Sequence, residues 1–181
     1  MAHLFSRGIF LASVGLLAGL TGAVLVQSSS SDMQFAKDAA LGGMTEVELG
    51  KIAVQKASNE KVKEFGQRMV DDHSKVGDEF KGIAAKDNIV LPGELDAKHQ
   101  AMVDRFSRMS AGSDFDRAYV RDMVRDHHTD IAAFEKEANA GQNPDLKNWA
   151  GNTLPTLREH LRLAEDAQRS VGTATSSSLG K

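Results

Sequence analysis

The sequence predicts an all-α protein: an antiparallel four-helix bundle with one extra short helix and an N-terminal apolar segment. Three observations support this prediction. Apolar residues recur every three or four positions over four long stretches, which is the period of a helix with one buried face. No stretch alternates apolar and polar residues as a half-buried strand would. Aromatic residues make up only 6% of the chain, so aliphatic residues, alanine and methionine must supply most of the core.

The first two expected helices cover about residues 32–57 and 60–86, and Ser58-Asn59 separates them. A turn over residues 87–93, marked by Pro92-Gly93, leads to a short helix over about residues 94–109. Ser113 is expected to cap a helix that ends at Gly141. Asn143 followed by Pro144 predicts the start of a last helix, which is expected to end near residue 169.

The expected domain organisation is a leading segment over residues 1–27, a helical-bundle domain over 28–169 and a disordered tail over 170–181. In the leading segment, Arg7 precedes an apolar or small-residue run of 19 from Gly8 to Val26. This run is either a cleaved signal peptide or a membrane anchor over residues 8–26. Both alternatives predict an exported, periplasmic or cell-envelope protein that contacts the inner membrane only if the segment is retained.

Composition excludes several classes of function. The chain has no cysteine, so disulfides, thiolate catalysis and Cys-based zinc sites are excluded. A net charge of −3 without a basic stripe argues against a nucleic-acid partner. No nucleophile elbow, Ser/His/Asp arrangement or phosphate loop is present. We therefore assign no catalytic or cofactor-binding residue and favour a non-enzymatic role, while the sequence identifies neither a protein partner nor an oligomeric state.

A short motif occurs twice. Met69-Val70-Asp71-Asp72-His73 returns 54 residues later as Met123-Val124-Arg125-Asp126-His127. An aromatic residue precedes each Met by four positions and another follows each His by seven, and these offsets keep to one helical face. Each copy thus places a histidine in the middle of an apolar stripe, where a polar group must find a partner.

Two further residues are expected at the same depth. At about 1.5 Å per residue, Glu46 and His73 lie ~18 and ~22 Å from the break between the first two helices. His127 and His160 lie ~22 and ~27 Å from the break between the last two. Four polar groups from four helices could therefore meet near the middle of the bundle. Glu46 has Gly42, Gly43 and Gly50 on its own face, which leaves room beside it or permits close helix contact.

These residues support two interpretations. In the first, Glu46, His73, His127 and His160 bind a transition metal such as iron, zinc, copper or manganese. Met69 and Met123 would then be optional thioether ligands, whereas Asp72 and Asp126 would orient histidines rather than bind. In the second, the same residues are only a hydrogen-bonded core of a structural or interaction module. A redox or detoxifying metalloenzyme is a third alternative and needs a metal with an open position.

Several segments carry a resemblance to a known family: Gly42–Gly50, the two Met-Val-x-Asp-His motifs, Phe115–Tyr119 and Leu154–Leu161. By these segments the chain resembles a bacterial family of exported proteins known as domain of unknown function 4142 (DUF4142). The resemblance runs from about Phe35 to Ala167 and implies a ferritin-like bundle in the cell envelope, without an activity. Di-iron bundles use Glu-x-x-His pairs, but the residues three before the histidines are Val70, Val124 and Leu157, so di-iron chemistry is not implied.

Overall fold

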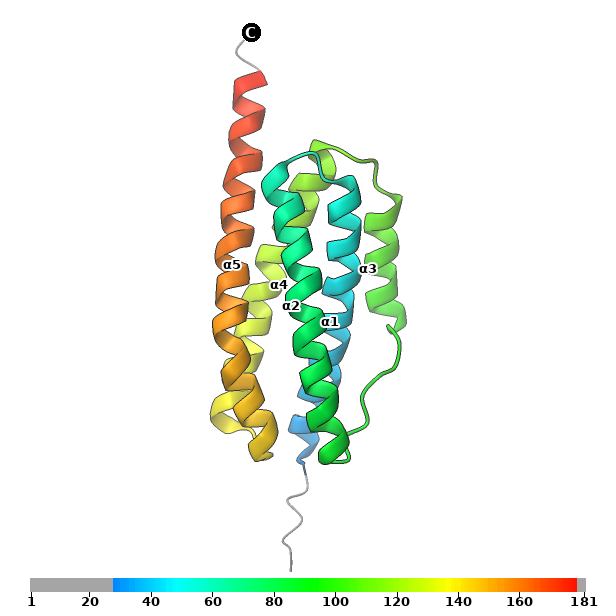
Figure 1. Cartoon of the computed structure of the whole chain (residues 1–181), viewed down its shortest axis with the longest axis vertical. Coiled ribbons are helices and arrows are strands. Elements are labelled where there is room, and N and C mark those ends of the chain that lie inside the picture. Colours follow the sequence, from blue (N-terminus) through cyan, green and yellow to red (C-terminus); the bar gives the residue numbers. More distant parts are fainter. Residues whose placement is uncertain (1–27, 179–181) are drawn as a thin grey trace, which may run out of the picture.

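The computed structural model describes residues 28–178, with side chains to Gly172, and contains five helices and no strand within that range (Figure 1). Four long helices form the bundle, and α3 packs on α1 at its outer side. The prediction of an all-α antiparallel bundle with one extra short helix is confirmed. The helices are α1 (Ser30–Lys56), α2 (Glu60–Lys86), α3 (Ala97–Arg108), α4 (Ser113–Ala140) and α5 (Pro144–Ser178).

The bundle consists of two hairpins, α1–α2 and α4–α5, and a buried aspartate ties each hairpin turn to the other hairpin. Asp116, in the first turn of α4, accepts hydrogen bonds from Ser58 N at 3.1 Å and Asn59 N at 3.0 Å in the α1–α2 turn. Asp32, in the first turn of α1, accepts hydrogen bonds from two backbone N–H groups of the α4–α5 turn. These are Gln142 N at 3.1 Å and Asn143 N at 3.0 Å. These bonds at opposite ends fix the hairpins relative to each other.

The core is divided along the bundle axis into two apolar clusters. On α2, α4 and α5 a buried histidine lies between a residue of the first cluster and one of the second, and on α1 Glu46 takes this place. Met69 and Met123 are fully buried in the first cluster. The main members of the first cluster are Leu49, Phe65, Met69, Phe106, Phe115, Tyr119 and Met123, and those of the second are Ala36, Phe80, Phe134, Leu146, Trp149 and Leu157.

Several expected helix boundaries are wrong. Ser113 is the first residue of α4 and not its cap, because Gly112 takes the cap position with a φ of 125° and no side-chain hydrogen bond. The short helix begins at Ala97 rather than near residue 94, because Asp96 caps it by accepting from His99 N. Asn143 does cap α5, as predicted, by accepting from Leu146 N at 3.0 Å.

The expected end of the last helix near residue 169 is also wrong, since α5 continues to Ser178. Val171 is buried against the first core cluster, and the Ser170 hydroxyl donates to the carbonyl of Ala167 at 2.7 Å. These contacts extend the helix into the segment for which composition predicted disorder, and residues 179–181 lie outside the described residues. The leading segment 1–27 also lies outside them. Within residues 28–178 no helix has the length and apolar character needed to cross a membrane.

The glycines of α1 serve two different purposes. A Cβ at Gly50 would lie 2.6 Å from the carbonyl oxygen of Gly66 on α2, so α1 and α2 approach each other closely here. A Cβ at Gly42, in contrast, would meet nothing within 4 Å. Close helix contact therefore explains Gly50, whereas Gly42 leaves open space.

Replacing these two glycines by alanine should have opposite effects. Ala has a higher helix propensity than Gly by about 1 kcal/mol, so Gly42→Ala should stabilise the protein by roughly that amount. Gly50→Ala should destabilise it by about 1–3 kcal/mol, because α1 and α2 must move apart. Urea denaturation of the two variants measures both changes, and equal effects would contradict the close contact between α1 and α2.

Candidate metal site

The structure brings together all four residues singled out by the sequence, one from each long helix. Glu46 lies on α1, His73 on α2, His127 on α4 and His160 on α5. Their exposed fractions are 5%, 8%, 0% and 1%, so the cluster is buried. The three imidazole centroids are 5.1 to 6.1 Å apart. One ring nitrogen from each histidine lies within 4.8 Å of the others.

Glu46 lies against two of the histidines. Its Oε2 is 3.2 Å from His73 Nε2, and its Oε1 is 3.5 Å from His127 Nδ1. Neither contact has hydrogen-bonding geometry, and Glu46 Oε1 and His73 Nε2 are buried without a hydrogen-bond partner. The carboxylate is therefore near two imidazoles without being satisfied by them.

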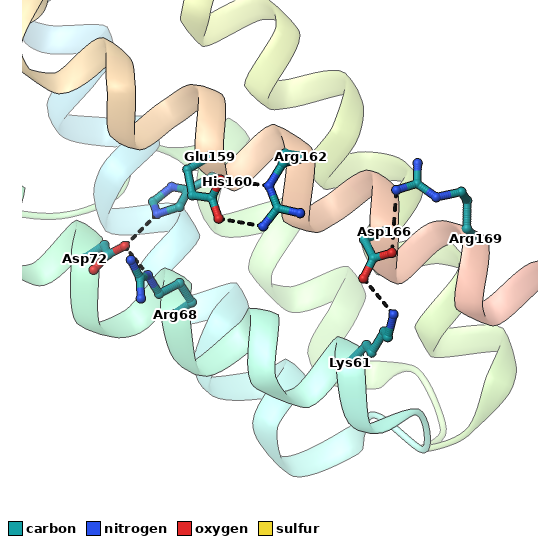
Figure 2. Close-up of polar contacts among 8 residues, drawn as sticks. All are labelled: Lys61, Arg68, Asp72, Glu159, His160, Arg162, Asp166 and Arg169. Atoms are coloured by element: carbon teal, nitrogen blue, oxygen red, sulfur yellow. Dashed lines mark hydrogen bonds and ion pairs between the residues drawn. The ribbon is translucent and has the colours of Figure 1, made fainter.

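The other two histidines are each oriented by a hydrogen bond from one ring nitrogen. His127 Nδ1 donates to the carbonyl oxygen of Met123 at 3.0 Å. His160 Nε2 donates to Asp72 Oδ2 at 2.8 Å, and Arg68 Nε donates to the same carboxylate oxygen at 2.6 Å (Figure 2). These bonds place the ring protons on His127 Nδ1 and His160 Nε2. They leave the lone pairs of His127 Nε2 and His160 Nδ1 buried and without a partner.

Asp72 thus contacts His160 of another helix, whereas Asp126, its counterpart in the second copy of the motif, contacts no histidine within residues 28–178. The sequence suggested that both Asp72 and Asp126 are histidine partners. Asp126 instead lies 3.2 Å from Arg125 on the bundle surface. The two copies of the motif are consequently equivalent in their Met and His residues but not in their Asp.

Burial keeps the imidazoles of His73 and His160 neutral. It lowers the pKa of His73 to about 3, and the nearby charge of His127 contributes further. It lowers the pKa of His160 to about 4, a change that the hydrogen bond to Asp72 only partly offsets. Two of the three histidines therefore stay unprotonated at neutral pH, which is the form that binds metals.

Two acidic groups near Glu46 were missed by the sequence analysis as site residues. Burial raises the pKa of Asp130 to about 8, and the charge of Glu46 adds to this shift. Tyr119 has a fully buried hydroxyl without a hydrogen-bond partner, and burial followed by the charge of Glu46 raises its pKa. Tyr119 occupies the position of Phe65 in the repeat. The tyrosine hydroxyl at a position where the other copy has a phenylalanine was therefore the sequence signal that could have identified Tyr119 as a site residue.

A cavity of about 510 Å³ connects one side of the cluster with the surface. Glu46, His73 and Asp130 are among its lining residues, whereas His127 and His160 are not. The remaining wall is mostly apolar and includes Phe80, Phe134 and Trp149. A small molecule entering this cavity would reach Glu46 and His73 directly.

Within the described residues, two further histidines are not part of the cluster. His99 on α3 contacts Asp96, with 2.6 Å between Nδ1 and Oδ1, and His128 is exposed on α4.

The donor set fits a first-row divalent ion. Three imidazoles and a carboxylate suit zinc, iron, manganese or copper(II), with Zn–N distances of about 2.0–2.1 Å. Nitrogens in a tetrahedral site of that size lie about 3.4 Å apart. The three rings, whose nitrogens lie within 4.8 Å, would have to close around the ion by about an ångström.

Fold and cluster together define an all-α bundle with a buried His/Glu centre. The chain belongs to the family described as Domain of unknown function (DUF4142), which matches residues 22–167. Its fold is similar to that of a DUF305 fragment from Deinococcus radiodurans, with a TM-score of 0.68 and 13% identity over 80% of this chain and 99% of that one. A DUF305 protein from Streptomyces coelicolor gives a TM-score of 0.64 and 14% identity over 79% and 94%. No curated protein sequence matches the chain.

The neutral His73 and His160 predict a contribution to the stability of the metal-free protein that is lost in acid. In the unfolded chain they take up protons below about pH 6.5, but in the folded protein only near pH 3 to 4. At these two residues the unfolded state therefore binds more protons, and their contribution to stability falls as the pH decreases from about 6.5 to 4. Asp130, whose pKa is raised, contributes with the opposite sign. The slope should reach at most about 1.4 kcal/mol per pH unit for each histidine.

Urea denaturation between pH 7 and pH 5 with a chelator measures this slope. His160→Gln should reduce it, whereas the exposed His128→Gln should leave it unchanged. The same slope in both variants would mean that His160 titrates normally in the folded protein.

Proposed function

We propose that this protein is an exported cell-envelope bundle that binds one transition-metal ion through Glu46, His73, His127 and His160. One observation carries the proposal: three buried imidazole nitrogens lack a hydrogen-bond partner. They belong to the three histidines of one cluster. A buried polar atom without a partner costs about 1–3 kcal/mol, so a ligand that contacts these nitrogens would remove this cost. A metal ion would satisfy all three at once.

The surroundings of the histidines support the same proposal. Metal-binding histidines usually donate their second ring N–H to a carboxylate or a backbone carbonyl, which fixes ring orientation and tautomer. His160 has the first kind of partner in Asp72, and His127 has the second kind in the Met123 carbonyl.

The protein would bind the metal ion or sense its state and would not be an enzyme. The chain lacks the Glu-x-x-His pairs of di-iron bundles, so oxidase chemistry is not carried over from the fold. The family itself is described only as a domain of unknown function. Zinc, iron, manganese and copper(II) all accept this nitrogen-rich set, and metal analysis must decide among them.

The alternative function is a structural or interaction module without a metal. The contact of Glu46 with His73 favours it, because a small rotation of these two side chains would turn it into a hydrogen bond. Measurements of metal binding separate the two proposals.

Export rests on the apolar run over residues 8–26 and on one structural relative. The DUF305 protein from Streptomyces coelicolor is named as a candidate secreted protein. We extend this to the present chain as a proposal, together with the division into a leading segment over residues 1–27 and a helical-bundle domain.

Purified protein that has not met chelator or nickel resin should contain about one metal ion per chain. His73→Ala, His127→Ala and His160→Ala should each weaken binding of that metal by at least 100-fold, because each removes one ligand. Asp72→Asn should weaken it by about 10- to 100-fold through the orientation of His160. Isothermal titration of the chelator-treated protein measures these affinities.

His128→Ala is the matched control, because His128 is exposed on α4 next to His127 and should bind metal like the wild type. Saturation at 100 times the Kd should stabilise the wild type by about 2.7 kcal/mol. Absence of bound metal, together with unchanged melting in copper, zinc, iron and manganese, would leave the hydrogen-bonded core as the correct interpretation.

Expression of the full chain in a bacterium with an outer membrane tests export. The protein should be found in the periplasmic or membrane fraction and not in the cytoplasm. The mass of the mature chain then distinguishes a cleaved segment from a retained anchor. Recovery of the full-length chain in the cytoplasmic fraction would contradict export.

A further inference from the structure

Three open glycines of α1 and α2 line one cavity. A Cβ at Gly42 or Gly77 would meet nothing within 4 Å, and one at Gly43 would only approach His73 Nδ1 at 3.9 Å. All three glycines line the 510 Å³ cavity beside the His/Glu cluster. Each interior glycine costs a helix about 1 kcal/mol relative to alanine, and here no close helix contact requires it. Their effect is to keep the cavity open.

The cavity has the size and the wall of a small-molecule site. Its volume of about 510 Å³ lies within the range of roughly 300–1,000 Å³ that is usual for such sites. Buried aromatic residues form its inner wall, where Phe80 stacks on Trp149 with centroids 4.0 Å apart. Phe134 lies against the same indole at 5.2 Å. This wall fits an apolar, ring-sized group.

The charge of the cavity favours a cation. Its lining residues include only one basic side chain, that of Lys81, but five carboxyl groups: Glu46, Glu48, Asp78, Glu94 and Asp130. Glu48 is paired with Lys51 at 2.7 Å. Asp130 is mostly protonated in the empty cavity at neutral pH, and a bound cation would favour its ionised form. Lys81 is exposed and already pairs with Asp78 at 2.8 Å. Only 5% of the Glu46 surface is exposed, and its Oε1 accepts no hydrogen bond. An anion would be repelled here, whereas an ammonium group could donate to the unsatisfied carboxylate.

We propose that this cavity binds a small organic cation, a protonated amine with an apolar, ring-sized body. The ammonium group lies at Glu46 and Asp130, and the body packs on Phe80, Phe134 and Trp149. The proposal rests on the cavity and not on the metal function. Glu46 belongs to both sites, so amine binding is measured on protein freed of metal.

Trp149 provides a direct readout, because it is the only tryptophan in the chain and lines the cavity. Phenylbutylamine, phenylbutanol and phenylbutyrate are three probes with the same body and a positive, neutral or negative head. Titrated at pH 7 with chelator, the amine should change the fluorescence of Trp149 saturably and bind at least tenfold more tightly than the alcohol. The carboxylate should not bind. Equal binding of the three probes, or no binding of the amine, would overturn the proposal.

Two leucine substitutions test the location. Gly42→Leu should fill the cavity and abolish amine binding, and Gly77→Leu should do the same from α2. Gly82→Leu is the matched control, because its Cβ also meets nothing within 4 Å but Gly82 does not line this cavity. Circular dichroism confirms folding of each variant. Wild-type affinity in both Gly42→Leu and Gly77→Leu would overturn the location.

Asp130→Asn tests the charge. Measured at pH 9, above the raised pKa of Asp130, it should reduce the preference for the amine over the alcohol about tenfold while leaving binding of the alcohol unchanged. An unchanged preference would overturn the role of Asp130. Amine binding by metal-free protein that binds no metal in a separate titration would refute only the metal function, so the two proposals fail independently.

Discussion

The hydrogen bonds of Asp32 and Asp116 are the constraint on which the rest of this structure depends. Each carboxylate accepts backbone N–H groups from the turn of the opposite hairpin, and the two lie at opposite ends of the bundle. Apolar stripes alone permit one hairpin to slide past the other by a helical turn of about 5.4 Å. A slide of that size would move His127 and His160 away from Glu46 and His73, because each pair belongs to a different hairpin. The two aspartates therefore fix the level at which the four residues meet.

The cluster interrupts an otherwise apolar interior. Met69 and Phe65 pack on one side of it and Phe80 on the other, so the His/Glu layer divides one core into two. Replacing such a buried polar layer by apolar residues is often neutral or stabilising, and stability alone does not account for it. The layer also carries unsatisfied nitrogens, which a structural core would be expected to pair. These buried nitrogens without hydrogen-bond partners are the physical argument for a ligand.

The sequence predicted the helices and the depth of the site because both depend on simple geometry. Glu46 and His73 meet since each is a similar number of residues from a shared turn, and the same counting applies to His127 and His160. The end of α5 was mispredicted, because tail composition does not reveal that Val171 is buried by residues distant in sequence. Asp130 was missed for a related reason. It adjoins the apolar Ile131 on the expected stripe, and only the arrangement of α1 against α4 shows that Asp130 enters the cavity beside Glu46.

The glycine-rich stretch of α1 links these features. Gly50 contributes by close contact, since its missing side chain lets α1 approach α2 beside Gly66. Two helical turns earlier, Gly42 makes no such close contact, and its missing side chain leaves the cavity open. Glu46 lies one turn from each. The same helix thus holds its carboxylate against His73 through close contact on one side and exposes it to the cavity on the other. A buried carboxylate that is neither fully paired nor fully enclosed is poorly suited to a purely structural role. It is suited to a group that accepts a cation arriving from outside, whether a metal ion from the histidine side or an ammonium group from the cavity.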